Sequence, residues 1–302
     1  MNPAAHDWFD WSPIGARASG AWPGGARLAV AFVVAVEYYE MQPPAQAAWP
    51  ASLPGGFGRG PYPDFRTWSH REYGNRIGVF RVMDALDRHG MRATAAVDAY
   101  CARERSVVVD ECRRRNWEIA AHGEAVTRLL SSRLGEEDER SQIRAALQAV
   151  REAAGGDVAG WLGPEQGESA RTPALLAEAG IRYVLDWPND ELPYPMRTPG
   201  GPLVSLPMAI DLDDVFAHWH RKLSMARWRQ SIADAAERLL ADGESRPRAL
   251  VLCLHPWLVG QPWRISYLEE VLADLRRREG VWFATAGEIA ARCGAGDQRS
   301  AG

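Results

Sequence analysis

The chain has 302 residues, of which 46% are hydrophobic and 25% are charged, the balance of an ordinary globular protein with room for one large α/β domain. Its formal net charge is −4 and it has no Lys/Arg cluster, which argues against nucleic acid or an anionic membrane as a partner. No apolar run reaches the roughly 18 residues that predict a membrane span, and the N-terminus lacks the apolar core of a secretory signal. The four cysteines are scattered without a C-x-x-C pair, so we expect a reduced, cytoplasmic protein.

Residues 1–26 are rich in Gly, Pro and Trp and show no periodicity, which predicts an N-terminal arm packed on the domain. Four aromatic residues are its predicted anchors: Trp8, Phe9, Trp11 and Trp22. The apolar run 27–36 then predicts a buried strand that ends at Glu37. Residues 38–75, with many Pro, Gly and aromatic residues, predict a long loop, and such a loop inside a compact domain is usually functional or a lid.

From residue 77 onward, amphipathic helical stripes alternate with short apolar runs. The predicted helices cover 77–89, 104–115, 136–154, 172–179, 224–241, 266–278 and 286–292. The predicted strands cover 92–97, 117–121, 158–162, 181–185, 203–208, 248–254 and 281–285. This alternation predicts a parallel sheet with helices outside it, and the single-domain length favours a (β/α) barrel over 27–293. An open dinucleotide-binding sheet is disfavoured because no G-x-G-x-x-G follows the first strand, and 294–302 is a predicted disordered tail.

Five of the predicted strands end in a polar or ionisable residue. These residues are Glu37, Asp98, His122, Asp186 and His255. In a barrel, the carboxyl ends of parallel strands meet at one rim, where sites are built. Any one of the five could merely cap a helix or lie in a solvated loop, but all five together favour a site.

The residue types suggest acid–base chemistry more strongly than a metal centre. A carboxylate beside an imidazole provides a general base and a general acid. Neutral histidine and carboxylate are also zinc ligands, but the usual pair of histidines three or four residues apart is missing, because Val126 stands four residues after His122. His218 and His220 are two residues apart, and on a strand or loop their rings would point in opposite directions.

The order of Glu37, His122-Gly123, Gly160-Trp161, Asp186 and Leu254-His255-Pro256 resembles the polysaccharide deacetylases, carbohydrate esterase family 4. The similarity is greater to the branch that includes the polysaccharide-deacetylase-like allantoinases, and it runs from about residue 7 to residue 290. The segments that carry it, besides the arm Asp7–Pro13, are Tyr73–Gly78, Glu118–Gly123, Gly160–Pro164, Glu168–Ser169, Tyr183–Trp187 and Leu254–Arg264.

The resemblance implies a distorted (β/α)7–8 barrel, hydrolysis of a non-peptide carbon–nitrogen bond and assembly into a homo-oligomer. In the deacetylases, an Asp-Asp pair supplies a base and a metal ligand, two histidines complete the metal site, and a late Leu-His motif supplies the acid. Here the pair is replaced by Val36-Glu37, the second metal histidine by Val126, and the arginine-proline motif by Gly163-Pro164-Glu165. If a divalent metal such as zinc is bound, His122 with Glu37 would hold it; the allantoinase-like branch shows similar losses and works without one.

On this basis we expect four catalytic residues. Glu37 would be the general base, His122 would orient the carbonyl or stabilise the oxyanion, and His255 would protonate the leaving nitrogen. Asp186 would hold one histidine in the required tautomer, as carboxylates do in other sites.

Five further residues are predicted substrate contacts: Arg76, Glu168, Asp190, Trp187 and Trp257. Three of them also have ordinary structural interpretations: Arg76 as an ion-pair partner, Glu168 at the start of a helix, and Asp190 as a turn cap.

The expected substrate is a small cyclic amide or ureide, such as allantoin or a hydantoin, without nucleic acid or membrane partners. One alternative is a metal-dependent deacetylase of N-acetyl sugars, with a third ligand from Glu124, Asp98 or the pair His218/His220. The other is an inactive barrel that binds a small molecule, which the eroded metal triad supports. Against it, the strand-end carboxylates and histidines are all retained.

Overall fold

The computed structural model describes residues 6–17, 20–44 and 63–293. In these ranges the strands form a nine-stranded sheet in the order β6-β7-β5-β4-β3-β2-β1-β8, and β9 pairs with β1. Neighbouring strands are parallel except for β6 and β7. The strands are β1 Leu28–Val36, β2 Thr94–Val97, β3 Glu118–Ala121, β4 Gly160–Trp161, β5 Tyr183–Val184, β6 Tyr194–Met196, β7 Leu203–Ser205, β8 Arg248–Leu254 and β9 Val281–Phe283.

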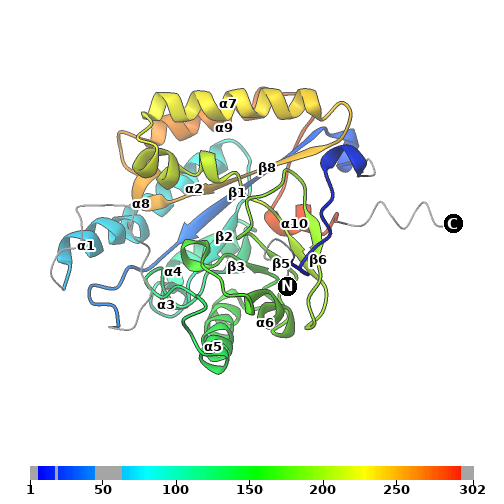
Figure 1. The fold of residues 1–302 in the computed structure, drawn as a ribbon. Helices are drawn as coiled ribbons and strands as arrows, with labels where there is room; N and C mark the ends of the chain where they lie inside the picture. The colour runs from blue at the N-terminus through cyan, green and yellow to red at the C-terminus, as the bar shows by residue number, and fades with distance from the viewer. Residues whose placement is uncertain (1–5, 18–19, 45–62, 294–302) are drawn as a thin grey trace.

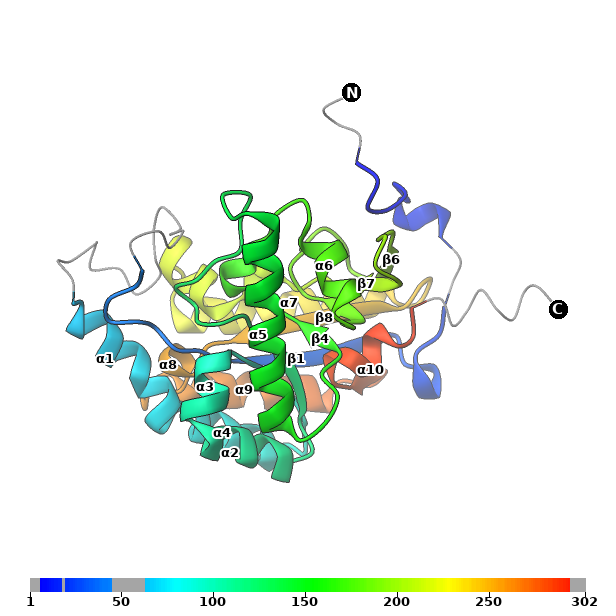
Figure 2. The ribbon, with the colours of Figure 1, turned by 90° about the horizontal axis from the view of Figure 1, so that it is seen from below.

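Helices cover the outside of this curled sheet. They are α1 Phe65–Tyr73, α2 Val79–Arg88, α3 Ala99–Glu104, α4 Ser106–Arg114, α5 Glu136–Ala154, α6 Thr172–Glu178, α7 Met225–Asp242, α8 Pro256–Val259, α9 Ile265–Arg277 and α10 Ala286–Ala290. Figure 1 shows α7 and α9 side by side at the top and α5 at the bottom. In the turned view of Figure 2, α5 lies in front of the strands and α7 behind them, so the two helices flank opposite sides of the sheet.

The central strand β1 is buried on both faces because it separates two hydrophobic layers. Val30 and Phe32 pack in the outer core with the helices, whereas Ala31 and Val33 pack in the inner core with Val251 of β8. A strand with apolar neighbours on both sides needs a continuous apolar sequence, which is what residues 28–36 provide.

The predicted distorted (β/α) barrel is confirmed, and its distortion lies between β8 and the segment that carries β6 and β7. No strand ladder joins these two ends among the described residues. Isolated backbone hydrogen bonds bridge them instead: Ala249 N donates to Glu191 O at 2.8 Å and Ala209 N donates to Val251 O at 2.9 Å. The structure is therefore a curled half-barrel rather than a closed ring of strands.

Several predicted elements differ from the structure. Part of the predicted loop 38–75 is helix α1, which begins because the Asp64 side chain accepts a hydrogen bond from Thr67 N; residues 45–62 lie outside the described ranges. The predicted helix 104–115 is α4, whereas α3 before it was not predicted; the two helices are separated at Arg105, whose backbone is not helical. The antiparallel strand β6 was not predicted. His218 and His220 lie on a π-helical turn, η6 Phe216–His220, and not on a strand or loop.

The arm packs on the domain through three of its four predicted anchors. Trp8 and Phe9 lie edge-on to the Trp187 ring, with centroids 5.4 and 5.9 Å away. Trp22 is buried and its indole N–H donates to Arg248 O at 2.8 Å. Trp11 is 84% exposed, so its prediction as an anchor is wrong. Across the described residues, no helix is both long enough and apolar enough to cross a membrane.

Two glycines let helix α8, and with it the end of β8, approach a π-helical turn, η3 Gly74–Gly78. A Cβ added at Gly78 would lie 2.1 Å from Pro256 O, and one at Gly260 would lie 2.5 Å from Gly78 Cα. Both contacts are with backbone atoms, which cannot rotate away as a side chain can. This close approach positions His255, the residue that caps the start of α8.

Gly78→Ala should therefore lower the free energy of unfolding by about 1–3 kcal/mol, the usual cost of overpacking, measured by urea denaturation. Gly156→Ala is the matched control, because a Cβ there meets nothing within 4 Å. Equal stabilities for the two variants would contradict the packing argument.

Candidate active site

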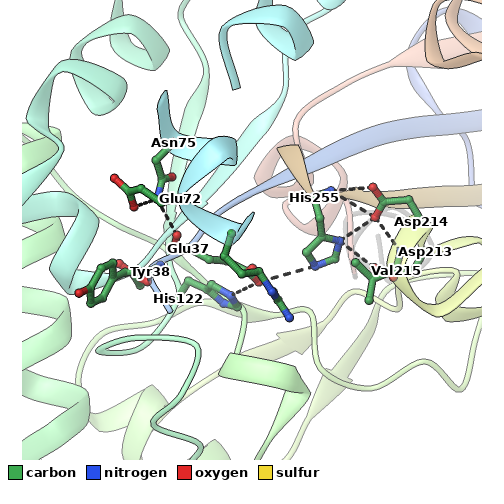
Figure 3. Close-up of polar contacts among 11 residues, drawn as sticks. Glu37, Tyr38, Glu72, Asn75, His122, Asp213, Asp214, Val215 and His255 are labelled. Carbon is green, nitrogen blue, oxygen red and sulfur yellow. Dashed lines mark hydrogen bonds and ion pairs between the residues drawn. The ribbon is translucent and has the colours of Figure 1, made fainter. Parts of the chain in front are cut away.

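Three of the five predicted strand-end residues meet in one place. Glu37 follows β1, His122 follows β3, and His255 follows β8 and precedes α8. Figure 3 shows the Glu37 carboxylate between the two imidazole rings. Its Oε1 lies 3.4 Å from His122 Nε2 and 3.6 Å from His255 Nε2. They converge because β1 lies next to β8 on one side, and on the other side only β2 separates β1 from β3.

A guanidinium completes the surroundings of Glu37. Arg71 of helix α1 lies with Nη1 3.1 Å from Glu37 Oε2, and its guanidinium covers the Trp257 ring at 4.3 Å. Asn75 Nδ2 donates to the Glu37 backbone carbonyl at 2.8 Å. Burial alone would raise the pKa of Glu37, but His255, His122 and Arg71 together lower it to about 2.

The predicted role of Glu37 as general base is therefore disfavoured. Both carboxylate oxygens face cationic groups, and a carboxyl with a pKa near 2 is a weak base at neutral pH. Its evident effect is electrostatic, because it stabilises the protonated forms of the imidazoles on either side.

His255 is held by two carboxylates that the sequence analysis did not single out. Asp214 Oδ1 lies 2.7 Å from His255 Nδ1, its Oδ2 accepts the His255 backbone N–H at 3.0 Å, and Asp213 Oδ2 lies 3.6 Å from Nδ1. Burial would lower the pKa of His255, but Asp213, Asp214 and Glu37 raise it to about 10. His255 is therefore an imidazolium at neutral pH. Two consecutive aspartates beside an apolar segment were the sequence signal for this pair.

His122 is buried and oriented by the neighbouring strand. Its Nδ1 lies 2.7 Å from Leu162 O, where it donates, so that Nε2 faces Glu37. Burial would lower the pKa of His122, but the Glu37 carboxylate, the Leu162 carbonyl and Asp98 raise it above 6.5.

Asp186 does not contact a histidine, so its predicted role is wrong. Its Oδ1 accepts a hydrogen bond from Gly163 N at 2.7 Å, and its neighbour is the carboxyl of Glu168, which also accepts from Trp187 Nε1 at 2.9 Å. Burial, and then the mutual repulsion of the two carboxyls, raises the pKa of Asp186; burial is the main cause that raises the pKa of Glu168 to about 7. The Glu168–Asp186 pair therefore holds a proton at neutral pH.

This carboxyl pair lines a hollow of about 310 Å³. The hollow is lined by Gln166, Glu168, Asp186, Trp187, Pro188 and Asn189. Trp187 and Glu168, both predicted substrate contacts, therefore lie at the surface of this hollow. A larger hollow of about 630 Å³ lies between the arm and residues 196–202, and none of the strand-end residues lines it.

The other predicted residues have structural partners or lie at the surface. Asp98 caps α3 by accepting from Cys101 N at 2.7 Å, and burial raises its pKa to about 7. Asp190 accepts from the backbone N–H of Leu192 at 3.1 Å and pairs with Arg17 of the arm, so the turn-cap interpretation applies. Arg76 is exposed on η3, and the residue that reaches Glu37 is Arg71, more than one helical turn earlier.

The residues do not fit the metal site that the resemblance allows. At Glu37 and His122 the neighbouring cation is Arg71, whose guanidinium would repel a metal ion, and Val126 offers no ligand atom. Among the described residues, one other cluster has three donors within 4.8 Å of one another: Asp213, Cys253 and His255. There, His255 Nδ1 is already bonded to Asp214, and burial raises the pKa of the Cys253 thiol well above its usual range.

The fold and this centre define a polysaccharide deacetylase-like barrel with a charged carboxylate–imidazole site. Residues 67–184 match the family model described as "Polysaccharide deacetylase". The resemblance drawn from the sequence motifs is confirmed over these residues, and the family that the model describes consists of hydrolases that generally use a metal.

Individual proteins resemble the chain over nearly its whole length. A Schizosaccharomyces pombe protein curated as "Putative polysaccharide deacetylase" is 24% identical over 299 residues, 89% of this chain and 91% of that one. The crystal structure of a probable polysaccharide deacetylase from Pseudomonas aeruginosa PAO1 is 25% identical, with a TM-score of 0.80 over 90% of this chain and 92% of that chain. The crystal structure of Puue allantoinase is 26% identical, with a TM-score of 0.81 over 90% and 91%.

The buried pair of His255 and Asp214 gives a testable link between charge and stability. Because the pKa of His255 rises from 6.5 to about 10 on folding, its stabilising effect is complete below pH 6.5 and is lost as the pH rises through 10. Asp214→Asn should lower the free energy of unfolding by about 3–5 kcal/mol at pH 7, and the difference from wild type should shrink toward pH 10. Imidazole NMR titration should show a lower His255 pKa in the variant.

Asp211→Asn is the control, because Asp211 is exposed and forms an ion pair at the surface with Arg221. A His255 pKa that stays near 6.5 in the wild-type protein would contradict the assignment of this pair.

Proposed function

We propose that the protein hydrolyses a non-peptide carbon–nitrogen bond in a small cyclic amide or ureide, such as a hydantoin or allantoin, without a metal. The observation that carries this proposal is the Glu37 carboxylate between two imidazoles and the Arg71 guanidinium. These fixed positive groups can polarise a carbonyl and stabilise its oxyanion, which is the task of the metal in a metal-dependent deacetylase.

The hollow beside the carboxyl pair supports a small substrate. Its volume of about 310 Å³ lies at the lower end of the range for small-molecule pockets. The protonated Glu168–Asp186 pair offers both a donor and an acceptor, and Asn189 and Gln166 can offer amides. Ureides and cyclic amides present N–H and C=O groups side by side, so their hydrogen bonds match this lining. The resemblance to Puue allantoinase is in keeping with this substrate class.

In this mechanism the charged centre supplies the acid and the oxyanion stabilisation. His255, with a pKa of about 10, carries a proton at neutral pH and donates it to the leaving nitrogen, which is far more basic. His122 and Arg71 stabilise the negative charge that develops on the carbonyl oxygen. Glu37 keeps the imidazoles protonated, and Trp187 and Glu168 contact the substrate.

Metal-dependent deacetylation of an N-acetyl sugar is the second candidate, favoured by the family match. Homo-oligomerisation and a cytoplasmic location stay predictions.

Turnover of hydantoins, allantoin and N-acetyl sugars should identify the substrate and test His255. His255→Ala should reduce kcat/KM by about 10²–10⁴-fold on the hydrolysed substrate, because a general acid contributes a factor of that size. His220→Ala, an exposed histidine on η6, should retain wild-type turnover. Equal rates for wild type and His255→Ala would remove His255 from the mechanism.

Chelation separates the two candidate functions. We expect the purified protein to hold substoichiometric metal by elemental analysis and to keep its turnover after dialysis against EDTA. Loss of activity on chelation, with recovery when zinc is added, would favour the metal-dependent deacetylase.

A further inference from the structure

One carboxylate near the charged centre has no part in the mechanism so far. Glu165 belongs to the single turn η4 Pro164–Gln166, which follows β4 directly. Its backbone has φ 52° and ψ 30°, and Gln166 has φ 54°. It is unusual for two consecutive residues other than glycine to have a left-handed backbone. Such conformations persist only where the surrounding structure imposes them.

The surroundings of η4 show what imposes this conformation. Before the turn, Leu162 O bonds the His122 ring and Gly163 N donates to Asp186. A Cβ on Gly123, the residue after His122, would lie 2.5 Å from the Pro164 ring. The turn is therefore wedged between the His122 loop and Asp186, and Glu165 lies at its tip.

Glu165 is solvent-exposed, yet the charges of the site surround it. Its charge interacts electrostatically with those of Arg71, Glu37, His255, His122 and Asp213. Within the described part of the chain, no hydrogen bond to its carboxylate is found, so its oxygens are open to water. The next residue, Gln166, lines the 310 Å³ hollow, so the turn that carries Glu165 adjoins both that hollow and the segment that bonds the His122 ring.

We propose that Glu165, and not Glu37, is the general base that activates the attacking water. This inference rests on the proposed amide hydrolysis and names the group which that reaction still lacks. The Glu165 side chain reaches solvent, but the protein packed around it still displaces part of the water that would hydrate its carboxylate. This loss of hydration is the main cause that raises the pKa of Glu165 above 4.5; Arg71 and the histidines lower the pKa, and Glu37 raises it. A carboxylate with a raised pKa binds a proton more readily than Glu37 does.

The step balances with groups already present. Glu165 takes one proton from water while the water oxygen bonds to the carbonyl carbon, and the C=O electron pair moves to the oxygen. As the oxyanion re-forms the carbonyl, the C–N bond breaks and the nitrogen receives the proton of the His255 imidazolium. The ring opens to one product that carries a carboxylic acid and the released N–H group, and transfer of the proton from Glu165 to His255 restores the enzyme. No oxidant, reductant or cofactor is consumed.

The test compares Glu165→Gln with Glu178→Gln, whose carboxylate pairs with Arg140 on the outer helices. Glu165→Gln should lower kcat/KM by about 10²–10⁴-fold and remove the acidic limb of its pH profile, while Glu178→Gln keeps both. Formate should partly restore the activity of Glu165→Ala, which a merely structural role would not allow. Glu165→Gly, which suits the positive φ, should unfold at a temperature no lower than wild type while remaining inactive.

The outcomes separate this inference from the proposed function. If the wild-type protein hydrolyses the substrate and Glu165→Gln does so within a few-fold, the base assignment is overturned and the function stands. If the wild-type protein hydrolyses nothing on the panel, the proposed function fails. Independently of turnover, a carboxyl NMR titration should place the Glu165 pKa above 4.5, and a value at or below 4.5 would overturn the inference.

Discussion

The buried Glu37 carboxylate, surrounded by two imidazoles and a guanidinium, is the interaction on which the site depends. One side of this group of charges rests on β1 and β3, another on β8, and the third on α1. An isolated carboxylate at 8% exposure would be costly to bury, so the cations and the carboxylate require each other. On its other side, His255 contacts two further carboxylates, Asp213 and Asp214, so that this imidazole lies between negative charges. The two core layers on either side of β1 fix the relative positions of β1, β3 and β8, and therefore of the three residues that follow these strands.

At this centre the Arg71 guanidinium lies where it would repel a metal ion, while Glu37, His122 and His255 remain in contact. Around Glu37 the chain places the Arg71 guanidinium, the His255 imidazolium and the His122 imidazole, whose pKa is raised by Glu37. A fixed guanidinium is always charged and cannot be lost to a chelator. The cost is that Glu37 becomes too weak a base to activate water. That leaves base catalysis to a different carboxylate, which is the role proposed for Glu165.

The two carboxyl groups that face the hollow differ from Glu37 in their charge environment. Asp186 and Glu168 have each other as neighbours and, within the described ranges, no guanidinium pairs with them, so burial and repulsion keep a proton between them. Glu37 has three cations within contact distance and stays ionised. Carboxyls in one region of the molecule thus differ in charge state, which is a common feature of sites that carry out both acid and base chemistry.

The sequence by itself determined the barrel and three of the strand-end residues. Apolar runs of strand length and amphipathic stripes are local patterns, and parallel strands bring Glu37, His122 and His255 to one rim whatever their separation in the chain. The sequence could not tell which carboxylate partners which imidazole. Asp186 and Asp214 are equally acidic in the sequence, and only packing placed Asp214 on His255 and Asp186 on Gly163 and Glu168. Likewise, Arg71 lay in a segment without a clear period, and the left-handed backbone of Glu165 is imposed by Pro164 and Gly123. Such partners depend on distances across the fold, and therefore on tertiary structure.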